Sequence, residues 1–216
     1  TLSTAFDVST ASFVDSFDFS SQSTSSHGLA FNSDGTKMFV LSDSGNDVNE
    51  YTLSTAFDVS TASFVDSFSV NSQESSAWGL AFSTDGTKMF VTGGSGDDVN
   101  EYTLSTAFDV STASFVDSFD IRSQDNNPYG LAFNSDGTKM FVTGDNGNDV
   151  NVYTLSTGFD VSSASFVDSF SVSSQETGPI GLAFNNDGTK MFVVGYDGDE
   201  VNEYSLVSPY SLINVT

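Results

Sequence analysis

The sequence predicts an all-β protein made of four copies of one four-stranded antiparallel unit. Three observations carry this prediction: a repeat of 51 residues, four strand signals in each repeat, and tight turn signals between them. The phrase TLST recurs at Thr1, Thr52, Thr103 and Thr154, and 32 of the 51 aligned columns are identical in all four copies. A repeat of this length is typical of one supersecondary unit that packs against its neighbours.

The second repeat shows the four expected strands, which we letter A to D in chain order. Strand A covers residues 79–82, and the Asp-Gly pair that follows it is a strong hairpin signal. Strand B covers residues 87–92, and a Gly-rich loop leads to strand C at residues 99–104. A longer loop, in which Asp109 is expected to cap a local turn, leads to strand D at residues 115–121.

Four antiparallel strands in about 50 residues match the size of one β-propeller blade. Both faces of the sheet carry bulk, because Met89 and Val91 point to one side and Phe90 to the other. Blades packed around a ring cover both faces, whereas the alternative, a β-helix, usually has shorter coils without Asp-Gly hairpins. We therefore predict a β-propeller of four four-stranded blades over residues 1–206, with residues 207–216 as a C-terminal tail.

One hairpin carries a resemblance to known repeats. The segment GLAFNSDGTKMFVTG, residues 130–144, resembles the inner hairpin of YVTN-like and NHL-like β-propeller repeats, and the same hairpin begins at Gly28, Gly79 and Gly181. The resemblance implies radial sheets around a channel with strand A innermost. It is specific for the fold and says little about function, because such propellers serve as enzymes, scaffolds and adhesive modules.

The first repeat begins in the loop before strand D, so the last blade needs an outer strand from elsewhere. We expect residues 13–19 to pair with residues 201–206, which closes the ring and protects a sheet edge. In the alternative, residues 211–216 fold back as that strand, and residues 13–19 complete a blade of another chain. Self-assembly through the terminal strands, including an eight-bladed ring of two chains, would follow from that alternative.

Composition excludes several classes of protein. The net charge is -24 with only five basic residues, which excludes nonspecific nucleic-acid binding by a basic surface. The chain has no Cys, which excludes disulfides and thiolate zinc sites, and it has no apolar run long enough for a membrane helix. The 21 Phe residues supply a core, in which we expect Phe13, Phe31, Phe39 and their equivalents. The acidic, Ser-rich composition favours an extracellular or cell-surface location, where salt screens self-repulsion.

The differences between repeats gather on one predicted face. Antiparallel order places the D–A and B–C loops on the same side of the ring, and 14 of the 19 varying columns fall there or at the end of strand D. The residue before strand A varies most in chemistry and gives the candidate ligand-binding set His27, Trp78, Tyr129 and Ile180. These side chains are expected to contact a protein or glycan ligand, and the alternative is that they only plug the channel.

Calcium is the candidate metal, because the B–C loops place carboxylate and amide oxygens around a Gly. The candidate ligands are Asp43, Asp47, Asp97, Asp98, Asp145, Asp149, Asp197 and Asp199. None of these loops matches the twelve-residue EF-hand pattern. A turn stabilised by side-chain hydrogen bonds explains the same residues without a metal, and it is the preferred interpretation.

Catalysis has weak support in the sequence. His27 is the single His, so no Ser–His–Asp arrangement can recur in each blade. We therefore expect no enzyme but a non-enzymatic extracellular binding, adhesion or surface-assembly module that uses the face of the D–A and B–C loops. A lactonase- or glycosidase-like propeller enzyme is the alternative.

Overall fold

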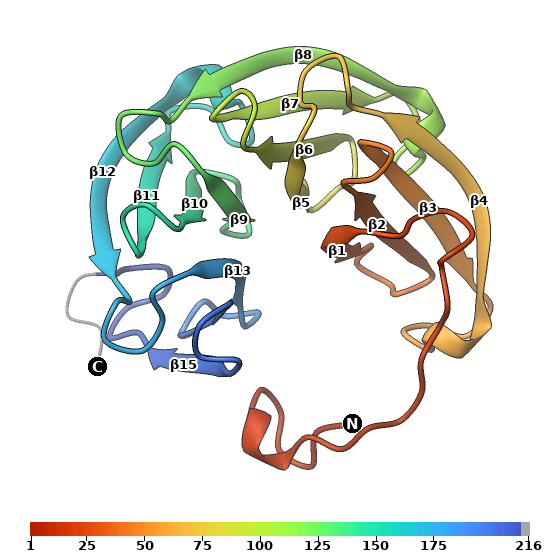
Figure 1. Cartoon of the computed structure of the whole chain (residues 1–216), viewed down its shortest axis with the longest axis horizontal. Helices are drawn as coiled ribbons and strands as arrows, with labels where there is room; N and C mark the ends of the chain where they lie inside the picture. The colour runs from red at the N-terminus through yellow and green to blue at the C-terminus, as the bar shows by residue number, and fades with distance from the viewer. Residues whose placement is uncertain (213–216) are drawn as a thin grey trace.

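The computed structural model describes residues 1–212 and confirms an all-β propeller with four blades (Figure 1). Blade 1 consists of β1 (Ser26–Phe31), β2 (Lys37–Ser42), β3 (Asp47–Leu53) and β4 (Ala62–Ser69). Blade 2 consists of β5 (Ala77–Phe82), β6 (Lys88–Gly93), β7 (Asp98–Leu104) and β8 (Ala113–Asp120). Blade 3 consists of β9 (Pro128–Phe133), β10 (Lys139–Gly144), β11 (Asp149–Leu155) and β12 (Ala164–Ser171). Blade 4 consists of β13 (Pro179–Phe184), β14 (Lys190–Gly195) and β15 (Val201–Ser205).

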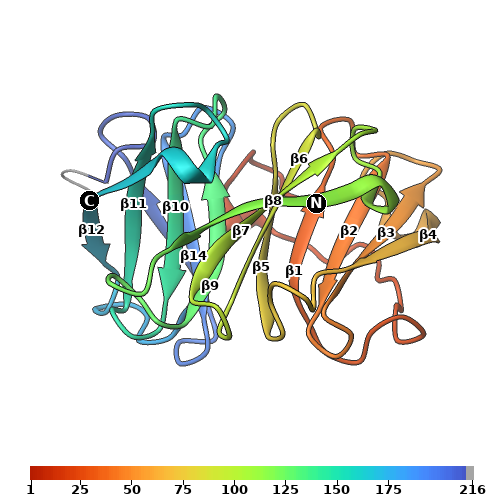
Figure 2. The ribbon, with the colours of Figure 1, turned by 90° about the horizontal axis from the view of Figure 1, so that it is seen from above.

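Each sheet is an antiparallel meander in which sequential strands pair, as the hairpin signals predict. The strands A, which are β1, β5, β9 and β13, line the inside of the arc, and the strands D, which are β4, β8 and β12, lie on its outside (Figure 1). Seen from the side, the connecting loops gather at the two ends of the strands (Figure 2). No helix among residues 1–212 is long and apolar enough to cross a membrane.

Local chemistry explains the turns. Gly86 has a φ of 71°, a conformation that suits glycine, and the neighbouring Asp85 carboxylate accepts a hydrogen bond from the Thr87 N–H at 3.0 Å. Each C–D loop contains one turn of 3-10 helix: η1 (Val8–Thr10), η2 (Val59–Thr61), η3 (Val110–Thr112) and η4 (Val161–Ser163). In η3 the Asp109 carboxylate accepts from the Ser111 N–H at 3.2 Å, which confirms the expected cap.

Aromatic side chains fill the space between blades. Phe90 of blade 2 is fully buried, and its ring lies 4.5 Å from that of Phe133 in blade 3. Phe39 and Phe141 are buried in the same way at the other two interfaces. The prediction of a Phe core is therefore confirmed for Phe39 and its equivalents, while Phe31 is only partly buried.

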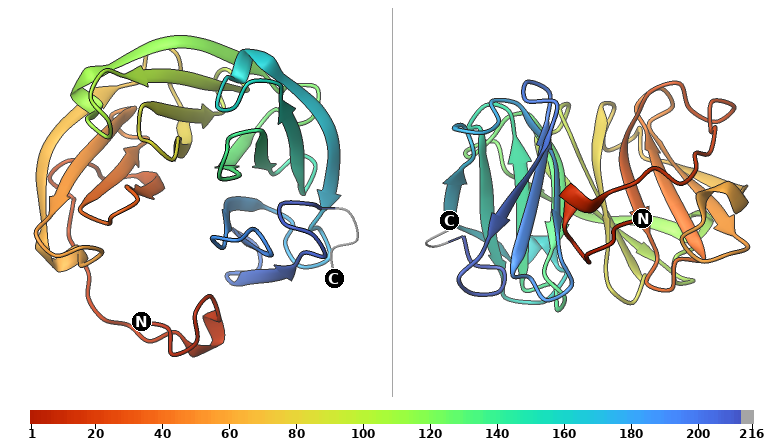
Figure 3. Two further views of the ribbon diagram at one scale, coloured as in Figure 1. Left: turned by 180° about the vertical axis from the view of Figure 1, so that it is seen from behind. Right: turned by 90° about the horizontal axis from the view of Figure 1, so that it is seen from below.

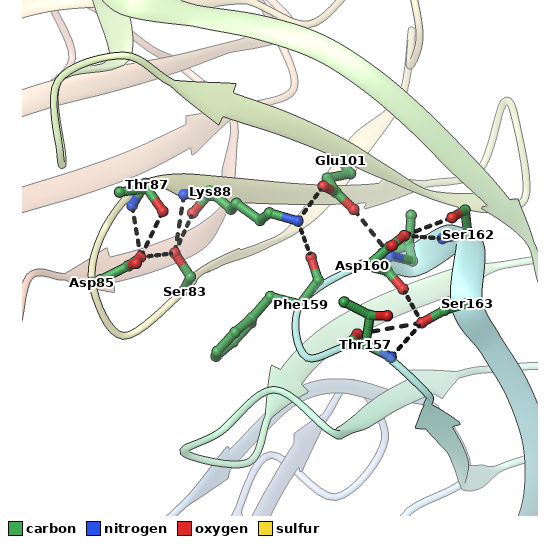
Figure 4. Close-up of polar contacts among 11 residues, drawn as sticks. Ser83, Asp85, Thr87, Lys88, Glu101, Thr157, Phe159, Asp160, Ser162 and Ser163 are labelled. Carbon is green, nitrogen blue, oxygen red and sulfur yellow. Dashed lines mark hydrogen bonds and ion pairs between the residues drawn. The ribbon is translucent and has the colours of Figure 1, made fainter.

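A polar network joins each blade to the next on the face of the A–B turns (Figure 4). The Lys88 ammonium donates to the Glu101 carboxylate at 2.7 Å and to the Phe159 carbonyl oxygen of the following blade at 2.6 Å. The other Glu101 oxygen accepts from the Val161 N–H at 3.0 Å. Glu101 is 2% exposed, so this pair is shielded from water and fixes the position of one blade against the other.

The expected closure of the ring within one chain is wrong. Residues 13–19 form no strand, and within the described part of the chain β15 pairs with β14 alone. Figure 1 shows an open arc in which β13 and β1 stand apart, with the N-terminal segment on the outside of the opening. Residues 213–216 of the alternative closing strand, residues 211–216, lie outside the described residues.

The N-terminal segment, residues 1–25, lies where the outer part of another blade would be (Figure 3). The ring of Phe17 lies 5.4 Å from that of Tyr51 and packs on blade 1. The Phe6 carbonyl oxygen accepts from the Lys190 ammonium of blade 4 at 3.4 Å. Phe13, expected in the core, is 85% exposed, because no strand C lies against this segment.

Candidate functional site

The D–A and B–C loops lie on one face of the propeller and are tied together by buried carboxylates. In blade 2, Glu74 is fully buried, and its carboxylate accepts from the N–H groups of Ser76, Ser95 and Gly96 at 2.7, 3.1 and 3.2 Å. Three charge-assisted hydrogen bonds from two loops hold their backbones in one arrangement. The predicted pairing of these two loops is thus what the structure shows.

A similar brace recurs in blades 3 and 4. Glu176 accepts from the N–H groups of Gly178, Asp197 and Gly198, and Asp125 accepts from those of Asn127 and Gly147. Burial raises the pKa of the Asp125 carboxyl, although its backbone hydrogen bonds oppose this shift. In blade 1 the equivalent residue is Ser23, whose hydroxyl donates to the Ser25 carbonyl oxygen at 2.8 Å.

Within this face, three of the four predicted ligand-binding residues form a row of rings. The rings of Trp78 and Tyr129 stack at 4.2 Å with an interplanar angle of 11°, and the His27 ring lies 6.5 Å from that of Trp78. Tyr196 of the B–C loop in blade 4 extends the row, with its ring 5.9 Å from that of Tyr129 in an edge-to-face contact. Ile180 lines the same channel mouth without joining the row. We call His27, Trp78, Tyr129 and Tyr196 the aromatic row.

The backbone of the strands A permits this stacking. A Cβ atom on Gly79 would lie 2.2 Å from the Tyr129 carbonyl oxygen, so only glycine allows the two inner strands to approach so closely. The Thr92 hydroxyl donates to the same carbonyl oxygen at 3.1 Å. Burial raises the pKa of the Tyr129 phenol, and the neighbouring Tyr196 adds to the effect. The Tyr129 phenol is therefore a neutral hydrogen-bonding group at physiological pH.

The predicted calcium ligands do not converge. Among residues 1–212, no group of three or more acidic, His or Cys side chains is placed to hold a metal ion. Asp98 accepts from the Asn100 side-chain amide at 2.6 Å, Asp97 pairs with Arg122 at 3.3 Å, and Asp197 accepts from the Thr177 hydroxyl at 2.6 Å. Asp97 and Asp199 also have positive φ at the turn, as Asn46 and Asn148 do. These contacts suit the turn interpretation, and calcium binding stays a prediction.

The remaining predicted ligands have equally local environments. Asp43 lies 3.9 Å from the His27 ring nitrogen, and Asp47 and Asp149 accept from the Asn49 and Asn151 amides at 2.9 Å. Burial raises the pKa of the carboxyl in Asp47, Asp98 and Asp149, which occupy the same position in three blades. One Asp145 oxygen is buried without a hydrogen-bond partner in the described chain.

Sequence reasoning missed two features of the site. Tyr196 is absent from the predicted ligand-binding set, although it is the one ring in a B–C loop. On the opposite face, the A–B turns border a cavity of about 360 Å³ that Phe82, Phe133, Phe159, Phe184 and Tyr210 line. The invariant Phe at the end of each strand A lies beside an A–B turn, and this position could have indicated the cavity. It was assigned to the core because it is apolar in every repeat.

Comparison with known proteins supports the fold alone. No family model and no curated protein sequence matches the chain. Among solved structures, the β-propeller domain of Cps50 from Myceliophteria thermophila matches 84% of this chain and 54% of its own, with a TM-score of 0.54 and 11% identity. The chain has the β-propeller fold.

Two further matches show how varied the functions on this fold are. The structure of a nidogen/laminin complex matches 88% of this chain and 63% of its own, with a TM-score of 0.59 and 15% identity. The periplasmic gluconolactonase of Pseudomonas aeruginosa matches 83% of this chain and 49% of its own, with a TM-score of 0.54 and 18% identity. The chain thus spans about half to two thirds of the structures it resembles, which include both an enzyme and a protein complex.

Proposed function

We propose that this chain is a non-enzymatic binding module of the extracellular space or cell surface, and that a glycan lies along its aromatic row. The observation that carries the proposal is the continuous series of rings from blade 1 to blade 4 across one channel mouth. Aromatic rings offer apolar area to the C–H faces of sugars at a low cost in conformational entropy.

The surroundings of the row suit sugar hydroxyl groups. The Tyr129 and Tyr196 phenols and the Ser, Asn and Asp side chains of the D–A and B–C loops supply donors and acceptors. The buried Glu74 and Glu176 carboxylates hold these loops in place without a ligand, so little ordering is needed on binding. Calcium bridging between ligand and the loop carboxylates is a further part of this proposal.

The chemistry of the residues favours binding over turnover. His27 is the single His, and its nearest acidic neighbour is Asp43 at 3.9 Å. Several acids of the loops are engaged in turns, since Glu74 accepts from backbone N–H groups and Asp98 from the Asn100 amide. A lactonase is the second candidate, and the observation in its favour is the fold shared with structures that include a gluconolactonase.

The test is a binding screen against soluble β-glucan, mannan and alginate, with and without a calcium chelator. Trp78 is the single Trp, so its fluorescence reports binding at the row directly. We expect the Trp78→Ala, Tyr129→Ala double variant to lose binding, measured by affinity electrophoresis. The control is Thr84→Ala, an exposed change at the cavity on the opposite face.

Three results would contradict the proposal. Binding that resists the double variant, or that Thr84→Ala removes, would place the ligand elsewhere. Capture of a basic protein with no affinity for any polysaccharide would replace the glycan with a protein ligand. Turnover of gluconolactone that exceeds the uncatalysed rate would favour the lactonase.

A further inference from the structure

Strand β15 ends blade 4 with an open edge in the described chain, and the N-terminal segment contains a matching strand. In the three complete blades, strand D pairs with strand C in one register, which in blade 2 joins Val99 to Phe119, Glu101 to Asp117 and Tyr102 to Phe115. Residues 11–18 read ASFVDSFD, which is identical to the whole of β8, and β15 reads VNEYS against VNEYT in β7. The chain therefore contains both the strand C and the strand D sequences of a complete blade, but in this structure the two segments are not paired.

The aromatic contacts show what β15 lacks. The Tyr102 ring lies between Phe68 of the preceding blade at 5.6 Å and Phe115 of its own strand D at 5.8 Å, and Tyr51 and Tyr153 have the same two neighbours. Within residues 1–212, the Tyr204 ring has Phe170 at 5.6 Å but no ring on the other side. The equivalent of Phe115 is Phe13, which is 85% exposed.

Blades 1 and 4 each also leave a Phe side chain at least partly exposed that the repeat pattern would bury against a neighbouring blade. Phe39, Phe90 and Phe141 are fully buried against the next blade, whereas Phe192 of blade 4 is partly exposed. Its natural neighbour in the repeat pattern is the ring in the C–D loop of a following blade. That ring in blade 1 is Phe57, which is 60% exposed.

In this structure the N-terminal loop around η1 occupies the position of the C–D loop that would follow blade 4. The Lys190 ammonium shows that it packs there only loosely. Lys37, Lys88 and Lys139 each donate to a carbonyl oxygen of the next C–D loop at 2.6 to 2.8 Å. Lys190 reaches the Phe6 carbonyl oxygen at 3.4 Å, and Val8 of that loop is 39% exposed, whereas the equivalent Val110 is buried.

We propose that a second copy of this chain occupies the open side of blade 4. Residues 11–18 of the second copy form strand D of blade 4, with Phe13 on Tyr204, and its blade 1 covers Phe192. The interface then continues the three blade interfaces already present, with the same strand D sequence in the same register. Addition of a strand to an open sheet edge supplies backbone hydrogen bonds over the whole segment.

Two observations favour a second copy over closure within one chain. Residues 13–19 remain packed on blade 1 of their own chain through Phe17, and β13 stands apart from β1 across the opening (Figure 1). When both copies exchange strands, a closed ring of two chains results.

The decisive experiment joins two different copies through cysteines, since the chain has none of its own. The register of the complete blades pairs Asn100 with Ser118, so the proposal places Asn202 opposite Ser16. We expect a mixture of Asn202→Cys and Ser16→Cys chains to form a disulfide between the two under mild oxidation, identified by peptide mass spectrometry. The matched control is Asp15→Cys in place of Ser16→Cys, whose side chain points to the other face of the strand.

Light scattering supplies the second measurement. The chain should have twice its 22.9 kDa mass, and Phe13→Ala should weaken the dimer about tenfold or more while leaving the monomer equally stable. A monomer at all concentrations, with an internal disulfide in the Asn202→Cys, Ser16→Cys double variant, would show closure within one chain. Absence of any linkage, or equal linkage with the control, would show that β15 does not accept this strand. Each of these results overturns the proposal.

Discussion

Truncation of Phe90 tests how the blades are held together. Phe90 is fully buried in β6, and its ring contacts Phe133 of the next blade at 4.5 Å and lies 6.2 Å from Phe159. Loss of a buried Phe side chain removes about 3 kcal/mol of transfer free energy and leaves a cavity between two blades. We expect Phe90→Ala to lower the free energy of unfolding by about 3–5 kcal/mol.

The fourth repeat supplies a matched control at the same position. Phe192 has the same neighbours within its blade but is partly exposed, because no following blade covers it in the described chain. Phe192→Ala should cost roughly 1–2 kcal/mol, since less area is buried and no closed cavity forms. The difference between the two variants measures the contribution of the blade interface.

The assay is guanidinium unfolding followed by far-UV circular dichroism, at a concentration where light scattering shows a monomer. In a chain of this length, a loss of 3–5 kcal/mol corresponds to a fall in the melting temperature of roughly 6–20 °C. A cost below about 1 kcal/mol for Phe90→Ala, or equal costs for both variants, would show that strand B does not face the next blade.

Three further changes follow from individual contacts. Burial raises the pKa of three equivalent B–C loop carboxyls above the ordinary 3.8, so the stability that their protonation gives is present below that pH and is lost as pH rises through the folded-state pKa. Replacing all three with Asn should flatten the fall in unfolding free energy over the acidic range above that value, measured by urea titration, and an unchanged pH profile would contradict this. The three are Asp47, Asp98 and Asp149. Glu101→Gln should cost roughly 1–3 kcal/mol, because it weakens a buried pair with Lys88, while Glu203→Gln in a 29% exposed pair should cost under about 1 kcal/mol in the same titration. Gly86→Ala should cost about 2 kcal/mol or more, because φ is 71° and the new Cβ would lie 2.1 Å from the Phe108 ring; a thermal melt equal to that of the unmodified chain would show that the turn adapts.

The sequence was sufficient for every feature that depends on neighbours in the chain. Strand B of the second repeat, expected at residues 87–92, is β6 (Lys88–Gly93), and the capped turn at Asp109 is η3. Alternating apolar residues and Asp-Gly turns act over a few residues, so one repeat contains the information for one blade. The pairing of the D–A and B–C loops on one face also follows from antiparallel order.

Features that depend on the relation between blades were not predictable in the same way. Whether four blades close a ring depends on the rotation from one blade to the next, which is set by the packing of Phe90 and its equivalents and not by any local pattern. The expected burial of Phe13 was wrong for this reason: the register of the complete blades would place it opposite Tyr204, but within the described residues β15 pairs with β14 alone. The buried role of Glu74 was likewise hidden, since a Ser, an Asp and two Glu share one column.

The near identity of the repeats has a physical explanation in the blade interfaces. Each blade packs one face against the blade before it and the other face against the blade after it. The residues of one repeat must therefore fit the residues of both neighbouring repeats. A change in Phe90 or Lys88 of one repeat would therefore disturb its contacts with a neighbour that still carries the original partner. Blade 3 shows how such a change is accommodated: Val152 replaces the Glu of strand C, and Leu212 packs against it in place of the usual Val.

The D–A and B–C loops are less constrained, because the hydrogen bonds that hold each braced loop pair go largely to backbone N–H groups. In blades 2, 3 and 4 a buried carboxylate braces the loop pair through backbone N–H groups, and these are present whatever the neighbouring side chains are. The side chains above the brace are then free to differ, and the differing residues include His27, Trp78 and Tyr129. Variation on this face is thus compatible with a fixed fold, and only the loss of binding in the Trp78→Ala, Tyr129→Ala variant separates a selected surface from one that has merely drifted.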